Sequence, residues 1–190
     1  MGTYGIVIEG QYDEVALTEI IKKCFSMEVE IIPRKCGGKD KLITRFPAYL
    51  ESFRYEKKGS HVDKAIVIRD AHGEDPEKIK EIMRGKIEKR NYPFKVKFII
   101  IAQELEAWLL ADEEAISRVT VDRSGKPVPR VNESLESIPQ PKQTLHKILG
   151  EARVAYTDGV AREIAKESDL DKIEYRCPRF REFRQTVIDC

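Results

Sequence analysis

The sequence lacks the features that mark secreted, disulfide-bonded or membrane proteins. Its four cysteines lie far apart without a C-x-x-C pair, so they predict neither a zinc site nor a disulfide framework. No apolar run approaches the ~18 residues that cross a bilayer, and the N-terminal residues show no basic and apolar leader. We therefore expect a cytoplasmic protein with reduced thiols and no membrane partner.

An excess of either charge is also missing, with 34 Lys and Arg against 33 Asp and Glu. This balance gives no reason to expect a polyanion partner, so any basic surface must be local. The chain has no Walker A pattern and no Ser-His or Cys-His triad pattern, which argues against P-loop nucleotide binding and triad catalysis. Its 190 residues fall within the usual size of one domain.

Short apolar runs alternate with segments of helical periodicity over the first hundred residues or so. This alternation predicts parallel strands joined by crossover helices. We expect strands at 4–8, 29–32, 64–68 and 96–101, with Pro33 closing the second, and helices at about 12–25, 41–53 and 76–90. The predicted fold class is therefore α/β, with a Rossmann-like parallel sheet of about four strands flanked by helices.

The alternation stops after residue 101. A helical stretch through Trp108 to about Arg118 follows, and then a polar, proline-containing connection over 121–141. Helical patterns return at 143–149, 158–166 and 178–188. We predict a single domain, with the α/β core in residues 1–118 and a connection with a helical extension packed on that core in residues 119–190.

Acidic residues follow three of the predicted strands. Glu9 follows the first strand, Asp70 the third, and Glu104 and Glu106 the fourth. Ligands of open parallel sheets bind beyond the carboxyl ends of the strands, where these carboxylates would repel one another unless a cation neutralised them. Oxygen ligands favour Mg²⁺ or Mn²⁺, so we predict a divalent metal site. Taken singly, each acid is also explained as a helix cap or first-turn charge, which suits Asp13 best.

Two segments resemble the motifs of Toprim domains, including those of bacterial primases. Residues 6–14, I-V-I-E-G-Q-Y-D-E, contain an E-G-x-x-D pattern formed by Glu9, Gly10 and Asp13. Residues 66–73, I-V-I-R-D-A-H-G, resemble the strand that ends in D-x-D, with Asp70 as its first aspartate. The resemblance implies a Toprim-like fold in which Glu9 acts as general acid or base and Asp70 holds Mg²⁺.

His72 stands where the second aspartate of D-x-D would be. The change removes one negative oxygen ligand and offers an imidazole. Either His72, Glu74 or Asp75 completes a site with a preference shifted towards Mn²⁺, or the site has lost its chemistry while the fold is kept. A solvated loop histidine is the remaining interpretation.

Residues 103–112, Q-E-L-E-A-W-L-L-A-D, resemble the signature of a family of small, uncharacterised Toprim-like proteins. Those proteins resemble the Toprim half of nucleases of the overcoming-lysogenization-defect type, which work with an ATPase and are associated with defence against phage. The similarity continues through residues 139–142 and 176–183. It implies nuclease chemistry and a separate ATPase as partner.

A helix over the same segment would place Glu104, Trp108 and Asp112 on one face, with Glu106 turned away. Glu104 is therefore the preferred metal ligand and Glu106 the second choice. Asp112 is either a further ligand or the cap of the next helix. Trp108 is expected in the core because leucines surround it.

Two basic stretches could hold the backbone of a nucleic acid. The first surrounds a glycine loop at 37–38, whose N–H groups, with that of Gly10, could cradle phosphate; its cations are Arg34, Lys35, Lys39, Lys41 and Arg45. The second interleaves arginines with aromatic residues over 175–184. Its alternative interpretation is a solvated helix with aromatic core residues; its arginines are Arg176, Arg179, Arg181 and Arg184.

Three functions are consistent with these patterns. The leading one is metal-dependent phosphodiester hydrolysis on DNA or RNA, in which Asp70 holds the metal with Glu104 or His72 and Glu9 moves a proton. The second is a non-catalytic module that binds nucleic acid or a protein partner and keeps a degenerate metal site. The third is a small-molecule phosphatase or nucleotide-binding domain, because a fold does not determine a function.

Overall fold

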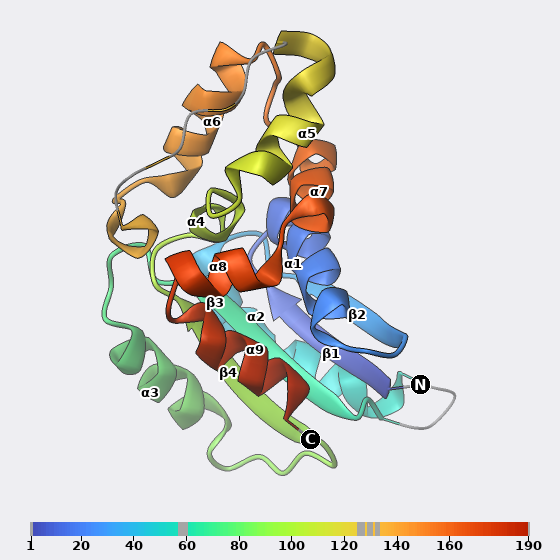
Figure 1. Ribbon diagram of the computed structural model, residues 1–190. Coiled ribbons are helices and arrows are strands. Elements are labelled where there is room, and N and C mark those ends of the chain that lie inside the picture. Colours follow the sequence, from blue (N-terminus) through green and yellow to red (C-terminus); the bar gives the residue numbers. More distant parts are fainter. Residues whose placement is uncertain (1, 57–60, 125–127, 129–130, 132–133, 190) are drawn as a thin grey trace.

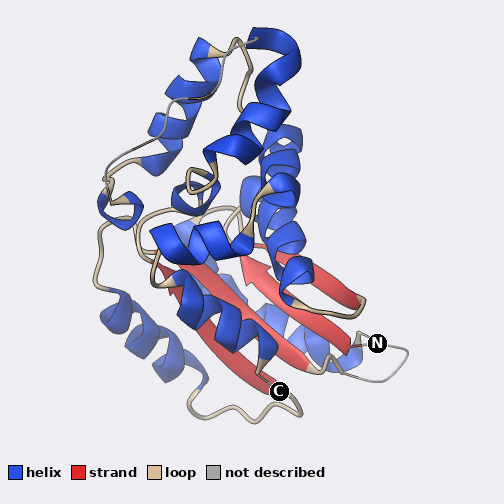
Figure 2. Ribbon diagram, in the orientation of Figure 1, coloured by secondary structure: helices blue, strands red, loops and turns tan. Residues whose placement is uncertain are grey.

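Four parallel strands form the centre of the protein. The computed structural model describes residues 2–56, 61–124, 128, 131 and 134–189, and it places the strands in the order β2-β1-β3-β4 (Figure 2). Their bounds are β1 Gly2–Ile8, β2 Val29–Lys35, β3 Lys64–Asp70 and β4 Lys95–Ile101. Every pairing is parallel, so the predicted α/β class with a Rossmann-like sheet is confirmed.

Helices cover both faces of the sheet, which explains why its strands are apolar on both sides. Figure 1 shows α1, Gln11–Cys24, in front of the sheet and α2, Lys39–Ser52, behind it. Successive strand residues alternate between the two layers, so Ile6 packs with the α1 layer and Val7 with the α2 layer. The α2 layer also contains residues of α3, Pro76–Ile87.

The C-terminal helices share one continuous core with the sheet. This core joins strand residues to the helices α7 Asp158–Glu167, α8 Leu170–Arg176 and α9 Phe180–Ile188. Trp108 is buried at its centre, with its ring centroid 4.9 Å from Phe180 and 4.7 Å from Phe183. The core position expected for Trp108 is therefore confirmed.

Beyond the carboxyl ends of the strands stand α4 Glu106–Leu109, α5 Glu113–Ser124 and α6 Pro141–Glu151 (Figure 1). The prediction of a single helix through Trp108 is wrong, because the first helix ends at Leu109 and a new helix begins at Glu113. The predicted connection over 121–141 lies partly outside the described residues. Within them, α5 continues to Ser124 and a short 3₁₀ helix spans Leu135–Ser137.

Pro33 does not end the second strand, since β2 continues to Lys35. β2 is an edge strand, where a residue without an N–H group is tolerated because only one side of the strand is paired. Residues 170–176 form α8, a helix that the sequence patterns do not predict. Among the described helices, none is long and apolar enough to span a membrane.

Candidate metal site at the carboxyl edge of the sheet

The order of the strands locates the position where a sheet of this kind binds ligands. The chain leaves β1 for β2 on one side and leaves β3 for β4 on the other, so the switch point of the sheet lies between β1 and β3. Glu9 directly follows β1, and Asp70 is the last residue of β3. The Asp70 amide donates to Glu9 Oε1 over 3.0 Å. The two residues predicted to be catalytic therefore meet at the position where such sheets bind ligands.

Asp70 is a buried carboxyl group with no partner in the part of the chain that the structure describes. Its side chain is 8% exposed, and within the described residues its carboxyl oxygens make no hydrogen bond or ion pair. Burial raises the pKa of Asp70 well above its usual value, and the negative charges of Asp13, Glu9 and Glu106 raise it further. This carboxyl group therefore lies in negative potential that the nearby His72 only partly offsets.

Asp13 and Glu106 complete this group of acids. Asp13 Oδ2 accepts the Gly10 amide over 2.7 Å and so caps the start of α1, as its alternative interpretation predicted. Burial, followed by the charges of Glu9 and Glu106, nevertheless raises the pKa of Asp13 to about 6. Burial also raises the pKa of Glu106, which is 3% exposed. The expectation that Glu106 turns away is wrong, because the helix that would have turned it does not form.

His72 lies between two carboxylates at this edge. Its backbone has φ 48°, and its amide donates to the Gln103 carbonyl over 3.1 Å, which ties the loops after β3 and β4 together. The imidazole Nδ1 is 3.5 Å from Glu104 Oε1, and Nε2 is 3.5 Å from Glu9 Oε2. These contacts raise the pKa of His72 to about 10. His72 is thus an internal cation within the cluster.

The contact with His72 lowers the pKa of Glu104, and the amide of Lys142 adds to this effect by donating to Glu104 Oε2 over 3.0 Å. Lys142 also places its amine 3.6 Å from Glu106 Oε1 and 4.5 Å from the centroid of the Tyr12 ring. The residue therefore contacts both acids that follow β4, from a helix of the C-terminal extension.

Tyr156 is a second contribution of the extension, and its hydroxyl donates to Glu106 Oε1 over 3.1 Å. Sequence reasoning missed the roles of Lys142 and Tyr156. Lys142 lies in residues 139–142, P-Q-P-K, which only the family resemblance singles out, and no local pattern distinguishes Tyr156.

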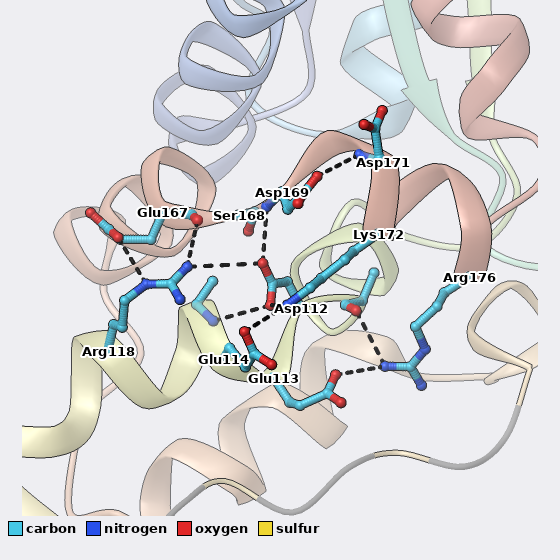
Figure 3. Close-up of polar contacts among 12 residues, drawn as sticks. Asp112, Glu113, Glu114, Arg118, Glu167, Ser168, Asp169, Asp171, Lys172 and Arg176 are labelled. Carbon is cyan, nitrogen blue, oxygen red and sulfur yellow. Dashed lines mark hydrogen bonds and ion pairs between the residues drawn. The ribbon is translucent and has the colours of Figure 1, made fainter.

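Asp112 lies apart from this cluster, in a separate polar junction (Figure 3). Its buried carboxylate accepts the amides of Ala115 over 3.3 Å and Asp169 over 2.9 Å, and it accepts the Lys172 amine over 3.1 Å. Burial acts to raise the pKa of Asp112, but these donors reverse the effect and lower it. Of its two predicted roles, the structure supports the helix cap, because the Ala115 amide belongs to the first turn of α5.

The glycine loop holds Glu9 in place. The amides of Gly37 and Gly38 donate to the Glu9 carbonyl over 2.8 and 3.0 Å, so neither amide is available to a phosphate. Most of the predicted cations in this stretch are also engaged: Arg34 pairs with Glu56 at 2.6 Å, Lys35 with Glu14 at 2.7 Å, Lys39 with Glu74 at 3.4 Å, and Arg45 donates to the Cys36 carbonyl. Lys41 has no ion pair within the described residues.

The alternative ligands considered beside His72 have other partners. Glu74 Oε1 pairs with Arg69 at 2.8 Å and with Lys39. Asp75 accepts the Glu77 amide over 3.0 Å and caps α3. Neither carboxylate therefore belongs to the group around Asp70.

The donor chemistry of the edge fits a divalent ion. Carboxylate oxygens are the ligands that Mg²⁺ and Mn²⁺ prefer, and the edge supplies them from Glu9, Asp13, Asp70 and Glu106. Among the residues that the structure describes, none pairs with the Asp70 carboxyl group. As the side chains lie, no three candidate ligands among the described residues converge closely enough to hold one ion. Binding would therefore require side-chain rotations, with His72 moving from between Glu9 and Glu104.

The fold and this edge define the protein as an α/β domain with a Rossmann-like sheet and an acidic group at its switch point. A model of the family described as "Domain of unknown function (DUF4276)" matches residues 8–188. The match spans nearly the whole chain, so the protein belongs to this family. Comparisons with curated proteins and with solved structures gave no match.

Proposed function

We propose that the carboxyl edge of the sheet binds Mg²⁺ or Mn²⁺ and that the protein hydrolyses phosphodiester bonds in nucleic acid. The observation that carries this proposal is the buried Asp70 carboxyl group, which has no partner within the described residues and is surrounded by the charges of three further acids. An uncompensated group of carboxylates is costly unless a cation joins it. The resemblance of residues 6–14 and 66–73 to Toprim motifs supports the same chemistry.

Glu9 and Asp70, with Asp13 and Glu106, would hold the ion. When bound, such an ion makes a water molecule more acidic and neutralises charge on the phosphoryl group. Glu9 is the acid best placed to move a proton, because the Asp70 amide holds Oε1 at the switch point and the movement of His72 would leave Oε2 without its present partner. The half-exposed Lys142 amine can pair with a phosphate oxygen at the same edge.

The test is calorimetric titration of the metal-stripped protein with Mg²⁺ and with Mn²⁺, followed by a nuclease assay in the preferred ion. Wild type should bind the ion, and Asp70→Asn should abolish binding. Asp75→Asn is the matched control, because Asp75 lies in the same connection but caps α3. Glu9→Gln should abolish cleavage while the protein stays folded. Failure of wild type to bind either ion would contradict the proposal.

The contacts of His72 favour one alternative function. An imidazolium between Glu9 and Glu104 can compensate charge without a metal, as expected of a non-catalytic module that binds nucleic acid or a protein. In that case wild type binds neither ion and cleaves no substrate. A separate ATPase partner and a role in defence against phage follow from the resemblance and extend the leading proposal.

A further inference from the structure

The arginines of residues 176–184 have different surroundings. Arg176 donates to the carbonyl groups of Leu110, Ala111 and Val131 and pairs with Glu113 at 3.2 Å. The other paired members are Arg181, 2.7 Å from Glu174, and Arg184, 2.8 Å from Asp171. The guanidinium of Arg179 makes no hydrogen bond or ion pair with the described residues. Three of these arginines are therefore engaged by other residues, and the guanidinium of Arg179 remains available.

Arg179 lines a cavity of about 310 Å³ that adjoins the candidate metal site. Gly73, the neighbour of His72, and Gln103, the neighbour of Glu104, also line it. The hydrogen bond from the His72 amide to the Gln103 carbonyl joins the two loops. The cavity therefore lies beside the loops that carry His72 and Glu104, after β3 and β4.

The polar groups of the cavity suit an anion. Ser134 adds a hydroxyl that has no partner within the described residues, whereas the Ser137 hydroxyl donates to the Ser134 carbonyl over 2.8 Å. Two acids also line the cavity, and both are partly compensated. Glu74 pairs with Arg69, and Glu136 accepts the Arg179 amide over 3.0 Å.

We propose that this cavity binds a second phosphate of the nucleic acid, next to the phosphodiester at the metal site, with Arg179 as its principal donor and Ser134 as an accessory donor. A guanidinium suits a phosphate because its N–H groups can donate to two phosphate oxygens at once. A second phosphate position beside the reacting one distinguishes a nucleic acid chain from a mononucleotide. The inference rests on the proposed function and adds the direction in which the substrate chain leaves the site.

The experiment measures binding of a fluorescein-labelled single-stranded DNA of about twelve nucleotides by fluorescence anisotropy. Titrations are run in EDTA, between about 50 and about 200 mM salt, so that no metal contributes and no metal-dependent cleavage occurs. Arg179→Gln is compared with Arg181→Gln, which removes the same charge two residues further along the chain but acts on an arginine paired with Glu174. Both variants are checked for an unchanged urea midpoint.

Arg179→Gln should weaken binding by about five- to tenfold, and the salt dependence should become shallower by about 0.7 in log–log slope. Arg181→Gln should stay within about twofold of wild type. Equal losses in the two variants, no loss in either, or a wild type that binds no DNA would each overturn the inference. So would adenosine monophosphate that binds as tightly as the DNA with the same dependence on Arg179.

This outcome is separable from that of the proposed function. Calorimetry decides whether the edge binds a metal, and the titrations in EDTA decide whether Arg179 binds phosphate. If the protein binds metal but Arg179→Gln leaves DNA affinity unchanged, the proposed function stands and the phosphate site in the cavity is rejected. If the protein binds no metal but Arg179→Gln weakens DNA binding, the phosphate site in the cavity stands as part of a non-catalytic binding module.

Discussion

Two buried aspartates, Asp70 and Asp112, differ in what surrounds their carboxyl groups. Asp112 accepts two backbone amides and a lysine amine, and its pKa is lowered despite burial. Asp70 has no donor within the described residues, has three acids near it, and has a raised pKa. Both side chains are under a tenth exposed.

Burial alone therefore does not distinguish a structural carboxylate from a functional one. A satisfied carboxylate such as Asp112 contributes to the fold because its removal leaves buried donors without an acceptor. An unsatisfied carboxylate such as Asp70 destabilises the folded state, as we expect of a group that binds a cation. The contrast predicts that substitution of the two aspartates changes stability by very different amounts.

The largest expected effect is on stability at the junction shown in Figure 3. Asp112→Ala should lower the free energy of unfolding by about 3 kcal/mol, because the amides of Ala115 and Asp169 lose their acceptor. Asp70→Asn should change it by less than about 1 kcal/mol in metal-free protein, since it removes a repelled charge. Urea unfolding with fluorescence of Trp108 measures both, and equal losses would remove the distinction between the two aspartates.

A second prediction concerns metal affinity at the edge. His72→Asp should tighten Mg²⁺ binding by about tenfold, because it replaces an internal cation by an oxygen ligand. Aspartate and asparagine both tolerate the positive φ of this position, so His72→Asn is the matched control without the added charge. If calorimetry finds the same affinity in the two variants, position 72 is not a ligand position.

A third prediction is a pH dependence of stability that is confined to the edge. The pKa of Asp13 is about 6 in the folded protein and 3.8 ordinarily, so its stabilising contribution is complete below pH 3.8 and is lost as pH rises through 6. The pKa of His72 is about 10 rather than 6.5, so its contribution is complete below pH 6.5 and is lost as pH rises through 10.

In EDTA, the stability difference between wild type and Asp13→Asn should therefore change by about 2 kcal/mol between pH 4 and pH 7. The difference between wild type and His72→Asn should change at higher pH, between about 6.5 and 10. Urea unfolding across this range measures both windows. Saturating Mg²⁺ should flatten the lower window if the ion replaces the proton, whereas an unchanged profile would separate Asp13 from the metal site.

The sequence alone determined the strands, the α/β class and the location of Glu9 and Asp70. These follow from local rules, because apolar periodicity identifies strands and parallel strands all end at one edge. The burial of Trp108 follows from its leucine neighbours in the same way. The proline inside β2 could not be placed, because whether a strand is central or at an edge depends on the order of the strands.

Only the tertiary structure decided which carboxylates are satisfied. Glu106 and Asp112 lie six residues apart in one segment, yet Glu106 joins the acidic edge while Asp112 joins a structural junction. Their partners are distant in the chain: Tyr156 is 50 residues from Glu106, and Asp169 is 57 residues from Asp112. The same holds for Arg179, because its surroundings depend on where α9 packs. A side chain's role here is determined by the donors and charges that folding brings to it, and spacing along the chain does not specify these.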